Sequence, residues 1–191
     1  MKETRVIEIR ATDPAGEQEA LILTGVPIVF DTPTTIRDPA GEYIEVIQRG
    51  ALDGADLSDV RLLYNHDTNR VPLARTPKTM ELKTTPAGLE MRATLPNTQD
   101  AKSVYEAVKR GDLTGCSFAF TIPDGGDSYD PKTNTRTITK IAKVYECSVC
   151  VFPAYPQTSV EARDARTASL NKYRAKQKAK ILINQIKKVE V

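Results

Sequence analysis

The sequence predicts an α+β protein whose strand-rich body folds as a closed or curled antiparallel barrel, followed by a helical C-terminal tail. Three observations predict this class. Apolar, β-branched or alternating stretches recur along most of the chain. In the body, only one segment has apolar residues at the spacing of a helix. Strands and helices do not alternate, which excludes a doubly wound parallel sheet. With 191 residues in total, we expect one domain at 1–160 and a separate tail at 161–191.

The first half of the predicted body consists of five strands separated by polar segments. They are expected at Thr4–Ile9, Ala20–Phe30, Tyr43–Ile47, Val60–Tyr64 and Leu89–Leu95. Gly25 and Pro27 interrupt the second strand, which predicts a bend or a bulge there. In the fifth strand apolar residues alternate with polar or charged ones, and this period of two is typical of a half-buried strand.

One amphipathic helix is expected inside the body. Its apolar face consists of Ala101, Val104, Tyr105 and Val108, which have the spacing of neighbours on one helix face. Asn97 or Thr98 can cap its start, and Gly111 is expected to end it. Two strands then follow, at Cys116–Ile122 and Thr135–Phe152, with a Pro-Asp-Gly-Gly turn sequence between them.

The C-terminal segment differs from the body in charge. Residues 163–191 contain nine Lys and Arg against two acidic residues, net +7, whereas the rest of the chain has 18 basic and 23 acidic residues, net −5. The apolar residues of the tail are Ala175, Ala179, Leu182, Ile186 and Val189 among others. Their spacing predicts a helix with a narrow seam. We expect this helix to dock on an acidic or helical partner, with nucleic acid or a solvated extension as alternatives.

Composition excludes several classes of protein. No apolar run approaches the roughly 18 residues of a membrane span, and the chain opens with no charged-then-apolar leader, so neither a membrane segment nor a secretory signal is expected. Three cysteines, an odd number, argue against a disulfide framework and fit a reducing compartment. The single histidine excludes any metal site that needs two. We expect no cofactor.

Three polar residues could take part in catalysis, although each also has a plain structural explanation. His66 follows the strand Val60–Tyr64, where an imidazole can be held and exposed, or it is a surface histidine in a turn. Ser117 follows Gly115, which permits close approach of backbone N–H groups to an oxyanion, or it is a hydrogen-bonded core serine. Glu146 lies in an apolar strand and needs a partner if it is buried, or it faces solvent at a strand end.

The last predicted strand has two different faces. Its period of two places Glu146, Ser148 and Cys150 on one face. Cys147 falls on the other. The three cysteines and the histidine could formally supply a Cys₃His zinc site, but Cys147 and Cys150 point in opposite directions and no Gly or Pro provides a tight turn between them. We therefore expect neither a zinc site nor a redox pair here.

Eight segments, in a fixed order along the chain, together resemble one known protein family. They are GVPIVFD at 25–31, RGAL at 49–52, LLYNHD at 62–67, PLART at 72–76, GLEMRA at 88–93, GDLTGCSFAF at 111–120, ECSV at 146–149 and PAYP at 153–156. Each is weak alone, but their order is specific. Over about residues 20–160 the chain resembles the prohead proteases of tailed bacteriophages, the caudovirus prohead serine proteases.

The resemblance implies a fold and a catalytic triad. The fold would be similar to the assemblins of herpesviruses, a strand-rich barrel wrapped by helices. The family's histidine corresponds to His66, its nucleophile to Ser117 and its acidic third member to Glu146. A serine hydroxyl needs an adjacent base, and His66 is the only imidazole in the chain. Two positions depart from the family pattern. Cys116 stands where a small residue is expected, and Pro-Leu-Ala replaces a glycine-containing stretch before Arg75.

The resemblance also implies a function in virion maturation. We expect a serine endopeptidase, inside the procapsid in the host cytoplasm, that cleaves the scaffold and the scaffold-like part of the major capsid protein precursor. Self-association is also expected, and self-cleavage at 157–170 would release the tail. The alternatives are a catalytically silent, protease-like assembly factor and a cytosolic esterase of unrelated fold.

Overall fold

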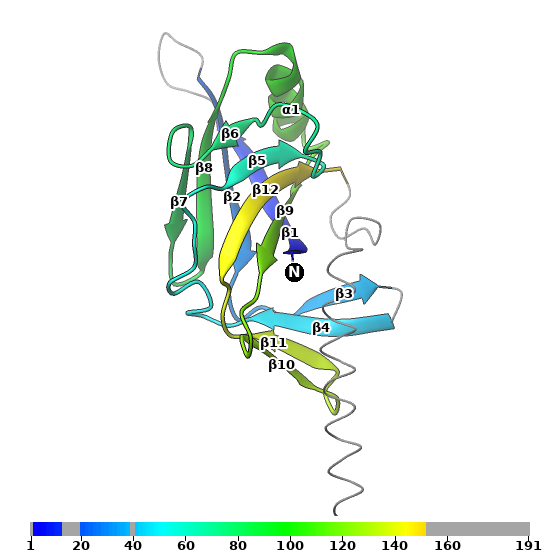
Figure 1. Ribbon diagram of the computed structural model, residues 1–191. Helices are drawn as coiled ribbons and strands as arrows, with labels where there is room; N and C mark the ends of the chain where they lie inside the picture. The colour runs from blue at the N-terminus through cyan, green and yellow to red at the C-terminus, as the bar shows by residue number, and fades with distance from the viewer. Residues whose placement is uncertain (1, 13–19, 39–40, 152–191) are drawn as a thin grey trace, which may run out of the picture.

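The computed structural model describes residues 2–12, 20–38 and 41–151, which form twelve strands and one helix (Figure 1). The strands are β1 (Lys2–Thr12), β2 (Leu21–Val29), β3 (Thr34–Asp38), β4 (Gly41–Ile47), β5 (Arg61–Tyr64), β6 (Ala74–Arg75), β7 (Met80–Thr84), β8 (Gly88–Leu95), β9 (Gly115–Thr121), β10 (Asp127–Asp130), β11 (Thr135–Ile138) and β12 (Lys143–Cys150). The helix, α1, spans Gln99–Arg110. In the described part of the chain, no helix has the length and apolar character that a membrane crossing requires.

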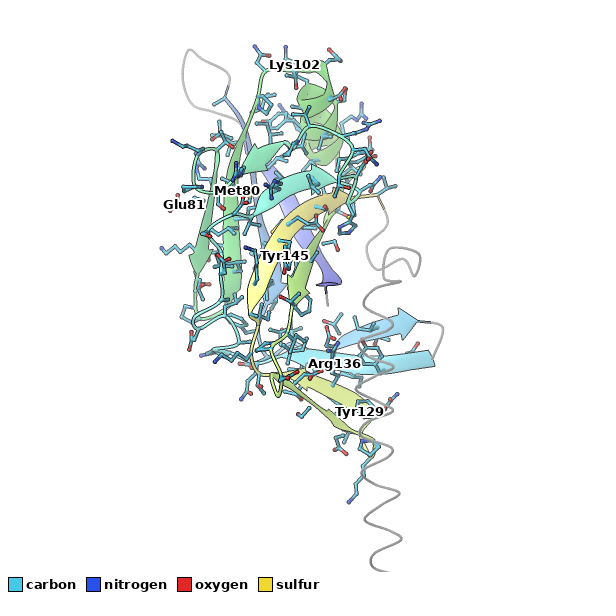
Figure 2. The ribbon with its side chains drawn as sticks, in the orientation of Figure 1. Met80, Glu81, Lys102, Tyr129, Arg136 and Tyr145 are labelled. Atoms are coloured by element: carbon cyan, nitrogen blue, oxygen red, sulfur yellow. The ribbon has the colours of Figure 1, made fainter. Side chains whose placement is uncertain are left out.

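Eight strands form the main sheet, in the order β6-β5-β12-β9-β1-β2-β8-β7. All neighbouring strands run antiparallel except β5 and β12, which are parallel. A second sheet has the order β10-β11-β4-β3, with β11 and β4 parallel. It lies at the end of the molecule opposite α1, as the positions of Arg136 and Lys102 show (Figure 2). The functional groups discussed below all belong to the main sheet and to the turn after β5.

The predicted barrel wrapped by helices is wrong. The main sheet is open, because β6 and β7 each pair on one side only. β6 has only two residues and lies between Pro72 and Pro77, and a proline cannot donate to a strand ladder. The sheet therefore does not close on itself. Among the described residues α1 is the single helix, so no set of helices surrounds the sheet. The predicted helical tail at 161–191 lies outside the described residues.

Local sequence signals place several elements correctly. Thr98 caps α1 by accepting a hydrogen bond from the Ala101 N–H, and Gly111 ends the helix with φ of 81°, a conformation that glycine adopts without strain. The predicted irregularity of β2 is a shift of register against β8 between Gly25 and Ile28. β8 alternates buried and exposed residues as predicted. The predicted strand Thr135–Phe152 is instead two strands, β11 and β12, in different sheets.

The two faces of β9 have different neighbours, and this difference positions the site. Cys116, Phe118 and Phe120 belong to the apolar core, which they share with the buried side of α1. Ser117 and Ala119 alternate with them and face the other way. All five residues are buried. One face of β9 therefore packs into the apolar core, while Ser117 lies on the other face.

Candidate active site

His66 lies in the turn that follows β5. Asn65 and His66 both have positive φ, 51° and 58°, a conformation that costs a non-glycine residue roughly 1–2 kcal/mol. β12 offsets this cost with hydrogen bonds to the turn. The Asn65 N–H donates to the Val149 carbonyl at 2.9 Å, and the Val151 N–H donates to Asn65 Oδ1 at 3.0 Å. Asparagine suits this position because it tolerates the left-handed region. The turn is thus bound to the end of β12.

The carboxylate of Glu146 lies beside the imidazole of His66. His66 Nδ1 and Glu146 Oε1 are 2.6 Å apart, with side-chain exposures of 16% and 4%. Parallel pairing places Glu146 of β12 alongside Arg61 of β5, the strand that leads into the His66 turn. Burying a carboxylate is costly unless hydrogen bonds and an adjacent group compensate it. The imidazole is one such group, and it forms a hydrogen-bonded His–Glu pair between the turn after β5 and strand β12.

Ser148 makes the second contact to this carboxylate. Its hydroxyl donates to Glu146 Oε2 and accepts a hydrogen bond from the backbone N–H of His66 at 3.2 Å. The direction of both bonds follows from chemistry, because a backbone N–H only donates and a carboxylate only accepts. The hydroxyl proton of Ser148 is therefore committed to Glu146.

Ser117 lies directly opposite Ser148 in the β9–β12 register. Directly opposed residues of an antiparallel pair share a face, so Ser117 lies on the same face as Glu146 and Ser148. Its side chain is fully buried, and among the described residues no group forms a hydrogen bond with its hydroxyl. A buried hydroxyl without a partner is unusual and costs free energy. The structure therefore brings His66 and Glu146 into contact and places Ser117 on their face, without a hydrogen bond between Ser117 and His66.

Cys150 lies next to both His66 and Ser117. Its Sγ is 3.6 Å from His66 Nε2, and a hydrogen bond from the Ser117 backbone also reaches the sulfur. Burial, and then the nearby charge of Glu146, raise the pKa of the Cys150 thiol to about 12. Burial likewise raises the pKa of Cys116 and Cys147. All three cysteines are free and buried, so they are protonated thiols at neutral pH.

Iodoacetamide is expected to leave the native protein almost unmodified at pH 7.5. The thiolate is the reactive form, and a thiol with a pKa near 12 is ionised in only about one molecule in 3 × 10⁴ at this pH. Mass spectrometry should find three alkylated cysteines after denaturation and essentially none before it. Rapid alkylation of the native protein at Cys150 would contradict the burial of this thiol.

The sequence predicted part of this site. The predicted face of Glu146, Ser148 and Cys150 is confirmed, since all three contact one another or His66. The contributions of Asn65 and Ser148 were not predicted, although the period of two already placed Ser148 beside Glu146. Asp67, another acid near the histidine in sequence, instead accepts from the Asn69 N–H and pairs with an arginine.

The structure also places Arg75 and Cys116, the residues at the two departures from the family pattern. Arg75 is exposed and pairs with Asp59, with Nε and Oδ1 2.6 Å apart, so its guanidinium is bound by a carboxylate that is not part of the His–Glu pair. Cys116 pairs with Val149 and faces the core. Within the described residues, no group of three or more His, Cys, Asp or Glu side chains could hold a metal ion.

The match to a protein-family model agrees with the sequence resemblance. The model of the family described as caudovirus prohead serine protease matches residues 5–174. Among solved structures, the capsid assembly protease gp21 of bacteriophage T4 is similar to the chain with a TM-score of 0.40 and 9% sequence identity, over 77% of this chain and 98% of that chain. No curated protein matches the chain. Because the family match covers most of the sequence, including the His–Glu pair and Ser117, the chain belongs to the caudovirus prohead serine proteases.

Proposed function

We propose that this chain is a serine endopeptidase in which Ser117 is the nucleophile, His66 the general base and Glu146 the residue that orients the imidazole. The supporting observation is the 2.6 Å contact between His66 and Glu146, with the unpartnered hydroxyl of Ser117 on the same face of the next strand. A serine, a base and an orienting carboxylate are the three groups that nucleophilic acyl transfer needs.

The hydrogen bonds favour Ser117 over Ser148 as the nucleophile. The proton of Ser148 is held by a carboxylate and its oxygen accepts from the His66 backbone. A hydroxyl held in this way is poorly placed to transfer its proton to an imidazole nitrogen. Ser117 has no competing hydrogen bond among the described residues. Its hydroxyl proton is therefore not held by another acceptor and is available for transfer to a base.

In the proposed mechanism, Glu146 accepts a hydrogen bond from His66 Nδ1–H, which leaves Nε2 as the basic nitrogen. Substrate binding brings Ser117 Oγ and Nε2 together, in place of the Cys150 contact of the free enzyme. Ser117 Oγ attacks the scissile carbonyl as its proton passes to Nε2, and Nε2 returns this proton to the leaving amine. Water then hydrolyses the acyl-enzyme through the same base.

Membership of the family supports a specific set of substrates. We propose that the enzyme cleaves the scaffold and the scaffold-like part of the major capsid protein precursor inside the procapsid. The alternative is a catalytically silent assembly factor, and one observation favours it, the absence of a Ser117–His66 hydrogen bond in the described residues. Incubating the purified chain with its own coat precursor separates the two. Specific proteolysis supports the endopeptidase, no reaction supports the silent factor, and turnover of simple esters alone would indicate an esterase.

The tail at 161–191 is proposed to dock on the scaffold, or on another acidic partner. Its net charge of +7 for residues 163–191 contrasts with the acidic remainder of the chain, which suits a separate interaction. Residues 157–170, which join the tail to the body, are mostly polar or small. Such segments are preferred sites of proteolysis.

We expect the enzyme to cut itself between residues 157 and 170 after assembly has concentrated it. Intact-mass spectrometry of protein from mature heads should find a wild-type chain that has lost the tail. Ser117→Ala isolated from procapsids should stay at full length unless wild-type enzyme is added. Wild-type chains that end at Val191 in mature heads would rule out self-cleavage.

A further inference from the structure

We propose that Ser148 is a positioning residue for catalysis, which fixes Glu146 and the His66 turn relative to each other. This inference rests on the proposed function, because it assigns Ser148 a role in aligning the base of the same site. Ser148 does not contact the substrate in this proposal. It acts only through the two residues that its hydroxyl joins.

The hydroxyl of Ser148 closes a ring of hydrogen bonds around the His–Glu pair. The ring runs from the His66 backbone N–H to Ser148 Oγ, from Ser148 to Glu146 Oε2, and from Glu146 Oε1 back to His66 Nδ1. One side chain thereby sets both the backbone position of the histidine and the orientation of the carboxylate. Without it, Oε2 would lose its donor and the carboxylate could rotate away from Nδ1.

The location of the ring makes this fixation necessary. His66 lies in a turn with two successive positive φ angles, a conformation that surrounding contacts must impose. The hydrogen bonds at Asn65 hold the residue before the histidine, and the Asp67 N–H, after it, donates to the Tyr64 carbonyl at 3.1 Å. Among the described residues, the hydrogen bond that the His66 N–H donates to Ser148 is the one that holds the backbone of His66 itself. Ser148 is fully buried, so water does not readily replace its hydroxyl.

The lone histidine of the chain gives a direct measurement that needs no activity. Because His66 is the only histidine, the imidazole signals in a ¹⁵N NMR spectrum come from this residue alone. In the wild type we expect a downfield, slowly exchanging Nδ1–H and one dominant tautomer. In Ser148→Ala we expect this proton to exchange rapidly and the two tautomers to mix. The titratable groups in contact with the imidazole of His66 are Glu146 and Cys150, and both remain in the variant.

Catalysis provides the second measurement. Ser148→Ala should lower kcat by about tenfold to a hundredfold, with a smaller change in KM, by analogy with hydrogen-bond partners that orient metal-binding side chains. In a Glu146→Gln background the same substitution should cost less than about threefold. Such non-additivity is expected when one residue acts through the other.

A matched control variant separates a positioning role of Ser148 from an effect on protein stability alone. Cys147 is the neighbour of Ser148 on β12, is equally buried and faces the core. Cys147→Ala should change the melting temperature without altering the imidazole spectrum or kcat per folded molecule. If Ser148→Ala fails to fold, Ser148→Cys keeps the side-chain volume while weakening both hydrogen bonds, and the same expectations apply to it.

The outcomes distinguish this inference from the proposed function. If Ser117→Ala abolishes cleavage while Ser148→Ala and Ser148→Cys keep wild-type kcat and an unchanged imidazole spectrum, Ser148 has no positioning role and the endopeptidase assignment stands. Loss of the ordered Nδ1–H signal together with the non-additive loss of kcat is the result expected. A fully additive loss in the Glu146→Gln background, with an unchanged imidazole spectrum, would also overturn the inference.

Discussion

Replacing Ser117 by alanine is expected to lower kcat/KM for a coat-precursor peptide by about 10³-fold or more, because the variant has no hydroxyl to form the acyl-enzyme. The fold should survive. The Ser117 hydroxyl has no hydrogen bond to lose among the described residues, and removing a buried polar atom without a partner can even stabilise a protein. Cleavage assays and thermal melts on the same preparation measure both effects.

Two control variants make the Ser117 result specific. Ser103→Ala removes an exposed serine hydroxyl on α1 and should leave activity unchanged. Cys116→Ala alters the residue next to Ser117, but on the face that packs into the core, so activity per folded molecule should be largely retained. Normal processing of the coat precursor by Ser117→Ala would show that another group is the nucleophile.

His66→Ala should be as damaging as Ser117→Ala, and the double variant should lose little more than either single one. A nucleophile and its base act as one unit, so their losses are not additive. Glu146→Gln should be milder, because in the proposed mechanism Glu146 orients and stabilises the imidazole but transfers no proton. Steady-state kinetics of the three single variants and the double variant test this ranking.

The Glu146 result decides the third member of the triad. In Glu146→Gln the new side-chain amide could still contact the imidazole, but without a negative charge, so a clear loss of kcat with a normal fold is expected. Unchanged activity in this variant would remove Glu146 from the mechanism. Asp67 would then be the next acid to test, although it now pairs with Arg70.

Elements with local signals could be predicted from the sequence. α1 has a capping threonine, a terminal glycine and an apolar stripe, so both its ends and its buried face follow from short-range chemistry. The same holds for the face shared by Glu146 and Ser148, because a strand has a strict period of two. Strand pairing between distant segments has no such local signal.

The two wrong fold predictions concern features that no local sequence pattern marks. The turn between β11 and β12 contains no glycine or proline, and the fully buried Ile141 within it continues the apolar pattern, so the pattern predicts one strand where the structure has two. The barrel prediction is wrong for a related reason. The number of strands is compatible with closure, but the prolines around β6 stop its ladder, and the hairpins β3–β4 and β10–β11 form a separate sheet.

The position of β12 also determines when the candidate active site can assemble during synthesis of the chain. β5, which leads into the His66 turn, and β9, which contains Ser117, do not pair with each other, because β12 lies between them. β12 is the last strand of the described body, so a chain still emerging from the ribosome lacks both Glu146 and the strand that joins the other two groups. Long-range pairings of this kind form late and slowly. We therefore expect nascent chains to have no proteolytic activity until the ribosome has synthesised and released residues up to Cys150, which would protect neighbouring polypeptides during translation.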